Sequence, residues 1–151
     1  LSKEDIVFDA YTGIGTIAIL AAKHAKHVIG VEIVNQAIRD AIRNAKHNGI
    51  NNVEFHANDV ADYMDLVAHN KQSIDVLFMD PPRKGADERF LKSVLTLKPK
   101  KIIYISCEPE TLARDIKLLL AKYNIENIQP VDMFPQTHHV EIVAALELKN
   151  Q

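Results

Sequence analysis

The sequence predicts an α/β fold with a seven-stranded, mostly parallel sheet and helices on both of its faces. Short apolar runs of strand length alternate with longer stretches of helical period along the chain, and strands joined by crossover helices form such a sheet. The chain has 151 residues, of which 47% are hydrophobic, so it suffices for one domain with a sizeable core but not comfortably for two. We therefore expect a single domain over residues 1–151.

The first half of the chain contains three strand-helix pairs in succession. Residues 6–8, 28–31 and 53–56 are apolar runs that predict strands. Each run precedes a stretch with apolar residues at helical spacing, and these stretches predict helices at residues 16–23, 36–47 and 60–68.

The second half continues the alternation but ends with two strands in succession. Further strands are expected at residues 74–79 and 102–105, helices at 88–96 and 112–122, and the last two strands at 128–132 and 140–148. Pro109 suits the first turn of the last helix. Because a short loop joins the final two strands, they should form an antiparallel pair at one edge of the sheet.

Charge and cysteine content exclude several classes of protein. The net charge of -2 and the pI of 6.4 argue against a surface that holds nucleic acid by bulk electrostatics. A single cysteine rules out a disulfide framework, and no apolar stretch has the length of a membrane span or signal-peptide core. We expect a cytoplasmic protein that does not associate with membranes. Since Leu1 stands only a few residues before a core strand, the chain is expected to be a piece of a longer protein.

A glycine-rich turn follows the first strand. Gly13 and Gly15 fit the pattern G-x-G-x-x-A, and Glu32 closes the second strand at the spacing of a nucleoside-binding motif, where a carboxylate accepts hydrogen bonds from ribose hydroxyls. A dinucleotide oxidoreductase and an S-adenosylmethionine (SAM) enzyme both have this pattern, and a plain tight turn is a third interpretation. Asp9 favours SAM, because its charge would repel a pyrophosphate but not a cationic sulfonium.

Two further residues could contact a cofactor at this end of the sheet. Asp59 follows the third strand, where it either approaches an adenine or caps the next helix; the two interpretations have equal weight. Tyr11 lies in the glycine turn and either packs against the cofactor or fills the core.

A rigid loop follows the fourth strand. Asp80 is followed by Pro81 and Pro82, which bar both helix and sheet pairing. Some nucleic-acid amino-methyltransferases have an aromatic residue after such a sequence, but this chain has Arg83, which disfavours methylation of an amino group. Asp80 either caps the following turn or hydrogen-bonds the reacting partners.

Cys107 and Glu141 are the candidate catalytic residues. Cys107 is the only cysteine and stands where a strand gives way to a helix, whose N-terminus favours a thiolate; the alternative is a small buried hydrophobe. Glu141 enters an apolar strand, which is costly for an acid unless it is paired or functional. A metal site formed by His139 and Glu141 is a weaker alternative, because the other histidines have no ligand spacing.

Four segments together resemble the RNA uracil-5-methyltransferase family: residues 9–15, 80–85, 102–115 and 134–141. Their order and spacing match throughout, and the resemblance covers nearly the whole chain. It implies a Rossmann-like, class I SAM-dependent methyltransferase domain that methylates carbon 5 of an unpaired uridine in RNA, with ribosomal RNA favoured over transfer RNA. It also implies a covalent cysteine adduct at carbon 6 and no metal.

The resemblance assigns roles to the candidate residues. By that likeness Cys107 is the nucleophile and Glu141 is the base. Together with the glycine turn, the expected cofactor-binding residues are Tyr11, Gly13, Gly15, Glu32, Asp59 and Asp80.

The chain departs from the family pattern in two ways. Glu108 stands where the family commonly has asparagine, and we expect its side chain to point away from the sulfur. The family's N-terminal RNA-binding β-barrel is absent from this sequence, so we expect little RNA affinity and weak activity from the chain alone. A SAM-binding module without catalysis and an NAD-dependent oxidoreductase remain as alternatives.

Overall fold

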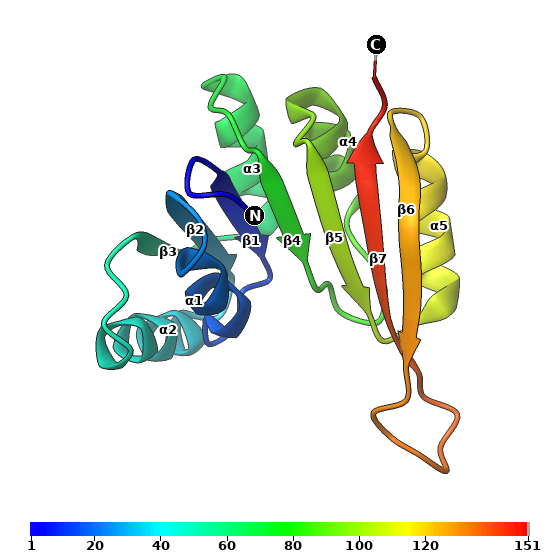
Figure 1. Cartoon of the computed structure of the whole chain (residues 1–151), viewed down its shortest axis with the longest axis horizontal. Helices are drawn as coiled ribbons and strands as arrows, with labels where there is room; N and C mark the ends of the chain where they lie inside the picture. The colour runs from blue at the N-terminus through cyan, green and yellow to red at the C-terminus, as the bar shows by residue number, and fades with distance from the viewer. Residues whose placement is uncertain (151) are drawn as a thin grey trace.

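The structure is a computed structural model that describes residues 1–150, within which the chain forms seven strands and five helices (Figure 1). The strands are β1 (Ile6–Ala10), β2 (His27–Glu32), β3 (Val53–Ala57), β4 (Val76–Met79), β5 (Lys101–Ser106), β6 (Tyr123–Val131) and β7 (Glu141–Leu148). The helices are α1 (Thr16–Ala22), α2 (Asn35–His47), α3 (Val60–His69), α4 (Glu88–Leu97) and α5 (Pro109–Leu119).

All seven strands belong to one sheet with the order β3-β2-β1-β4-β5-β7-β6. The neighbours from β3 to β5 pair in parallel, whereas β7 is antiparallel to both β5 and β6. The mostly parallel sheet and its antiparallel C-terminal pair are therefore confirmed. The chain leaves β1 toward β2 on one side and reaches β4 on the other, which makes a topological switch point where such sheets bind ligands.

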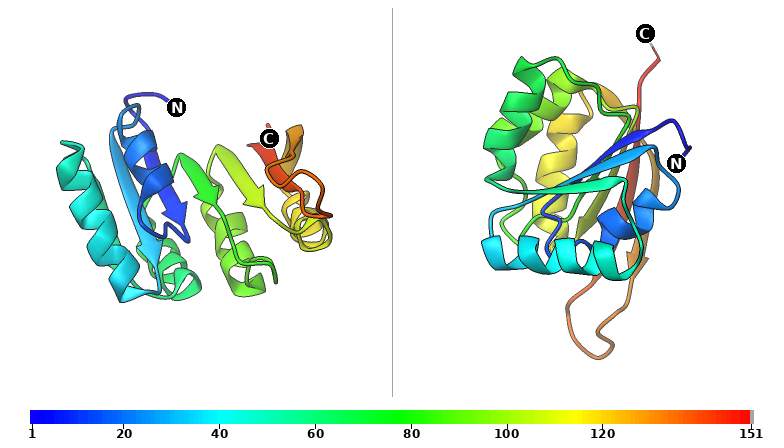
Figure 2. Two further views of the ribbon diagram at one scale, coloured as in Figure 1. Left: turned by 90° about the horizontal axis from the view of Figure 1, so that it is seen from below. Right: turned by 90° about the vertical axis from the view of Figure 1, so that its left-hand side faces the viewer.

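Helices cover both faces, as the sequence predicted. Helices α1 and α2 lie on one face, over β1 to β3, and α3, α4 and α5 lie on the other (Figure 2). Successive strand residues point to opposite faces, so Val7 packs with Ala18 of α1 while Phe8 belongs to the larger core beneath α3 and α4. This three-layer packing fixes the carboxyl ends of β1 to β5 at one edge of the molecule.

The prediction for the segment between α5 and β6 was wrong at its boundary. The helix was expected to run to residue 122 and the strand to begin at 128, but α5 ends at Leu119 and β6 begins at Tyr123. Tyr123 is fully buried and donates a hydrogen bond to the Pro99 carbonyl at 2.9 Å, which anchors the start of the strand. The remaining residues of β6 are exposed at the sheet edge, so no apolar alternation marks them in the sequence.

Candidate active site

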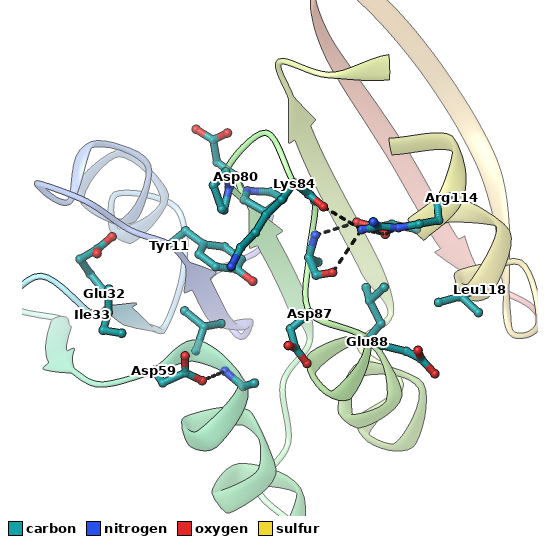
Figure 3. A pocket seen from close by; sticks show the side chains of 18 of the residues that line it. Tyr11, Glu32, Ile33, Asp59, Asp80, Lys84, Asp87, Glu88, Arg114 and Leu118 are labelled. Atoms are coloured by element: carbon teal, nitrogen blue, oxygen red, sulfur yellow. Dashed lines mark hydrogen bonds and ion pairs between the residues drawn. The ribbon is translucent and has the colours of Figure 1, made fainter. Parts of the chain in front are cut away.

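A cavity of about 1170 Å³ opens beyond the carboxyl ends of the parallel strands (Figure 3). Its wall includes the four predicted cofactor contacts that follow or close successive strands, namely Tyr11 after β1, Glu32 at the end of β2, Asp59 after β3 and Asp80 after β4. Residues from α4 and α5 complete the wall. The switch-point topology thus brings together side chains that lie far apart in the sequence.

The turn from β1 to α1 has left-handed backbone conformations at three residues. Tyr11, Gly13 and Gly15 have φ values of 62°, 55° and 85°. A Cβ atom on Gly15 would lie 2.8 Å from the Phe55 ring, so only glycine lets this turn pack against β3. Neither glycine belongs to the cavity wall. Both instead shape the turn that places Tyr11 in that wall.

Asp9 has a different position from the one assumed in the sequence argument. Its side chain is buried and accepts hydrogen bonds from the Thr12 hydroxyl at 2.5 Å and from the Ala18 backbone N–H at 3.0 Å. Burial raises the pKa of Asp9 from 3.8 to about 7, against the lowering effect of these hydrogen bonds. Asp9 therefore stabilises the glycine turn from inside the core. The preference for a cationic cofactor must instead rest on the acids of the cavity wall.

Glu32 and Asp59 present carboxylates along one side of the cavity. Glu32 accepts hydrogen bonds from the Gly13 N–H at 3.3 Å and the Val34 N–H at 3.0 Å, which hold its side chain beside the glycine turn. Asp59 caps α3, because its Oδ1 accepts from the backbone N–H groups of the next turn at 2.9 and 3.1 Å. The helix-cap interpretation of Asp59 is confirmed, and the same side chain also lines the cavity.

Tyr11 packs against a core residue and also lines the cavity. Its ring meets Phe90 edge-on, with ring centroids 6.0 Å apart, and it also forms part of the cavity wall (Figure 3). Burial raises the pKa of Tyr11 to about 12, so the hydroxyl remains a neutral donor and acceptor.

Asp80, Cys107 and Glu141 meet at the same end of three neighbouring strands. Cys107 follows β5 directly, and Glu141 begins the antiparallel β7. In the β5–β7 ladder Ser106 lies opposite Ile142, which brings the next residues outward, Cys107 and Glu141, across from each other. Both are half-buried, and neither belongs to the cavity wall.

Asp80 connects the strand ends that carry Cys107 and Glu141 with the cavity. Desolvation first, and then the nearby negative charge of Glu141, raise the pKa of Asp80. Asp80 itself is exposed to solvent. Its place at the same end of the sheet as Glu141 accounts for the effect of that second carboxylate on its pKa.

The cavity suits a nucleoside that carries positive charge. Glu32 and Asp59 offer carboxylate oxygens to hydroxyl and amino groups, Tyr11 offers an aromatic face, and Asp80 adds a further carboxylate to the wall. Over residues 1–150, no group of three or more His, Cys, Asp or Glu side chains could hold a metal ion. No helix in that range is long and apolar enough to cross a membrane.

The strand order, the glycine turn and the acid that closes β2 define a Rossmann-like, class I SAM-dependent methyltransferase domain. The chain belongs to the tRNA (uracil-5-)-methyltransferase family, which matches residues 2–149.

Relatives at the level of sequence are named RNA methyltransferases. The chain is 51% identical to an uncharacterised RNA methyltransferase of Halalkalibacterium halodurans and 50% identical to one of Listeria innocua, each match covering 99% of this chain and 33% of the relative. This chain therefore spans about a third of the length of the curated relatives that it matches.

Two solved structures are similar in fold. The Pyrococcus abyssi tRNA (uracil-54, C5)-methyltransferase, in complex with S-adenosyl-L-homocysteine, has a TM-score of 0.81 and 37% identity over 97% of this chain and 35% of that one. An rRNA methylase from Streptococcus thermophilus has a TM-score of 0.77 over 99% of this chain and 90% of that one, and its 16% identity shows only the shared fold.

Sequence reasoning missed several polar residues of the cavity wall, of which Asp115 is the most deeply buried. It lies on the face of α5 that also carries Leu112, Ile116 and Leu119, and it is completely buried. An acid at a position of apolar helical periodicity was the available signal, since such a residue must find partners inside the protein.

Proposed function

We propose that this chain is the catalytic domain of an enzyme that transfers a methyl group from SAM to carbon 5 of a uridine in RNA. The observation that carries the proposal is the meeting of Asp80, Cys107 and Glu141 at one corner beside the cavity. A nucleophile, a base and a cofactor cavity at adjacent strand ends are the groups that this reaction requires.

The cavity acids and the glycine turn would bind the cofactor. Glu32 would accept hydrogen bonds from the ribose hydroxyls, and Asp59 would accept one from the adenine amino group through the oxygen that does not cap α3. Tyr11 would pack against the nucleoside, with Gly13 and Gly15 giving the turn its shape, and Asp80 would face the cationic end. When bound, SAM supplies an electrophilic methyl group.

Cys107 would make carbon 5 of the uracil reactive. Its thiolate adds to carbon 6, which forms a sulfur–carbon bond and moves an electron pair toward carbon 5 and the carbonyl oxygen. Carbon 5 then forms a bond with the methyl group, and the bond between that group and its sulfonium breaks. An unpaired uridine is the expected target, because the ring must leave any stack to meet the sulfur.

Glu141 would complete the reaction as the base. It removes the proton from carbon 5, the electron pair restores the ring double bond, and the bond between carbon 6 and the sulfur breaks. Glu141 and Cys107 each stand one position beyond the Ser106–Ile142 pair that ends the β5–β7 ladder, which would place the base beside the nucleophile. The proton passes from Glu141 to solvent.

Release of tritium from RNA labelled at carbon 5 of uridine tests these roles separately. The full-length enzyme with SAM should release tritium into water in step with methyl transfer. Cys107→Ala should release none, and Glu141→Gln should still form the adduct at carbon 6 but release tritium far more slowly. Methyl transfer by Cys107→Ala at the wild-type rate would contradict the proposal.

A SAM-binding module without catalysis is the second candidate, because Cys107 and Glu141 stand outside the cavity wall. It predicts SAM binding with no release of tritium under any condition. An NAD-dependent oxidoreductase would instead prefer NADH over SAM in a binding titration of the purified chain.

The substrate and cellular location remain predictions. We expect ribosomal RNA as the preferred substrate over transfer RNA, an RNA-binding domain in the rest of a longer chain, and a cytoplasmic enzyme. Methylation of transcripts of each RNA by the full-length enzyme, followed by nucleoside analysis, measures the preference.

A further inference from the structure

Asp115 is a completely buried carboxylate that the proposed chemistry does not use. Its Oδ2 accepts hydrogen bonds from the Ala86 backbone N–H and from the Tyr104 hydroxyl, both at 2.7 Å. Its Oδ1 accepts a hydrogen bond from Nε of Arg114 at 2.8 Å and forms an ion pair with Nη2 of the same side chain at 2.7 Å. A buried charge is tolerated only when it is paired and hydrogen-bonded, so the position of each partner is tightly constrained.

Two neighbouring side chains of α5 extend this network to the loop between β4 and α4, residues 80–87, which we call the double-proline loop. Arg114 donates from Nη2 to the Lys84 carbonyl at 3.0 Å and to the Ala86 carbonyl at 3.4 Å (Figure 3). The Thr111 hydroxyl donates to the Arg83 carbonyl at 3.0 Å, with the Glu108 carbonyl as a second acceptor at 3.2 Å. The loop is therefore held by backbone groups of residues 83, 84 and 86 against the first turns of one helix.

Gly85 shows how closely the loop approaches this network. Its φ is +80°, and a Cβ atom there would lie 2.4 Å from Nη2 of Arg114 and 2.7 Å from Oδ2 of Asp115. The loop backbone thus packs directly against the two charged side chains. Any side chain at residue 85 would push the loop away from them.

The network connects the loop that carries Asp80 with the helix and the strand that flank Cys107. The loop begins at Asp80, which interacts with Glu141 and lines the cavity, whereas α5 begins two residues after Cys107. Tyr104, the third partner of Asp115, belongs to β5, the strand that ends just before Cys107. Contacts from α5 and β5 to the loop thus add to the β4–β5 strand pairing in connecting Cys107 with the cavity.

We propose that Asp115, with Arg114 and Thr111, is a positioning unit that clamps the double-proline loop to the element bearing Cys107 and so fixes Asp80 relative to the sulfur. The inference rests on the proposed function. None of the three residues is expected to touch the uracil. Loosening the clamp should misplace the reacting groups, and a misplacement of about 1 Å can lower a rate by about 100-fold.

The test measures a rate inside a preformed complex. Full-length enzyme is mixed with saturating SAM and RNA that contains 5-fluorouridine, whose fluorine blocks the final elimination, and the first-order rate of adduct formation is measured. Asp115→Asn keeps the shape but loses the charge that orients Arg114. Asp115 and Arg114 also belong to the cavity wall, so the rate is measured at saturating SAM and RNA, where a change in affinity does not alter it. We expect Asp115→Asn to slow adduct formation by about 10- to 100-fold under these conditions.

Thr111 provides a milder pair of variants. Thr111→Val removes the hydroxyl that reaches the Arg83 carbonyl, and Thr111→Ser keeps it. We expect slower adduct formation in the valine variant and near wild-type rates in the serine variant, which a purely steric role would not produce. If Asp115→Asn does not yield folded enzyme, the comparison of Thr111→Val with Thr111→Ser tests the proposal by itself.

Asp75→Asn is the matched control. Asp75 accepts a hydrogen bond from the Ile6 backbone N–H at 2.9 Å and pairs with Lys100 at 2.8 Å, at the end of the parallel strands opposite to the site, so its loss should leave the adduct rate unchanged. Wild-type adduct rates in both Asp115→Asn and Thr111→Val would overturn the positioning unit. Failure of the wild-type enzyme to form an adduct through Cys107 would overturn the proposed function itself, so the two failures are distinguishable.

Discussion

Asp9 is a residue whose burial should be visible in the pH dependence of stability. Its pKa is raised from 3.8 to about 7 by burial, so the folded state binds more protons than the unfolded state between these values. Asp9 therefore contributes stability that is fully present below pH 3.8 and is lost as the pH rises to about 7. Its contribution to the slope is at most about 1.4 kcal/mol per pH unit.

Asp9→Asn should remove this dependence, because the amide oxygen can still accept from Thr12 and Ala18 but does not ionise. We predict that the free energy of unfolding of Asp9→Asn, relative to wild type, increases between about pH 5 and about pH 8. Urea unfolding at both pH values measures it. A constant difference between the two proteins would show that Asp9 titrates normally in the fold.

Glu32 should be a major determinant of cofactor affinity. Glu32→Gln removes the charge and one acceptor oxygen, and the loss of a hydrogen bond to a charged group weakens binding by about 10- to 100-fold. Calorimetric titration with S-adenosylhomocysteine measures the effect. Glu4→Gln, at an exposed residue before β1, is the control and should bind normally. Equal affinities in the two variants would remove Glu32 from the cofactor site.

At the scale of elements, the turn between β1 and α1 depends on Gly15 more than on Gly13. Both have positive φ, but a Cβ atom on Gly15 would meet the Phe55 ring at 2.8 Å, while one on Gly13 would have nothing within 4 Å. We predict that Gly13→Ala costs about 1–2 kcal/mol of unfolding free energy from backbone conformation alone. Gly15→Ala should cost about 1–3 kcal/mol more, through overpacking. Chemical denaturation of both variants checks the order, and equal costs would contradict the packing argument.

Most elements could be predicted from the sequence because buried strands and amphipathic helices have distinct apolar periods. For the edge strand β6 the sequence predicted residues 128–132 but missed the start at Tyr123. After Tyr123 the residues of β6 are exposed, so the strand is defined by its hydrogen bonds to β7 and not by a pattern of buried side chains. The strand-end residues of the site could be placed because the carboxyl ends of parallel strands meet. The hydrogen-bond partners of Asp9 and Asp115 could not be predicted from the sequence, because buried hydrogen bonds depend on tertiary packing.

At the scale of the whole molecule, the chain should bind RNA poorly by itself. Its net charge is -2, so few phosphate contacts can release counterions. We predict that the 151-residue chain binds a uridine-containing RNA more weakly than micromolar at low salt, whereas a full-length relative binds more tightly. Fluorescence anisotropy with labelled RNA measures both, and affinity tighter than micromolar for the chain alone would contradict the expectation.

The central claim is that one sulfur activates the uracil ring. The most direct measurement is peptide mapping by mass spectrometry of the full-length enzyme after reaction with SAM and RNA containing 5-fluorouridine. We predict a covalent nucleotide on the peptide that contains Cys107, with the methyl group already transferred to the modified ring. An unmodified Cys107 peptide in enzyme that methylates ordinary RNA would contradict the account.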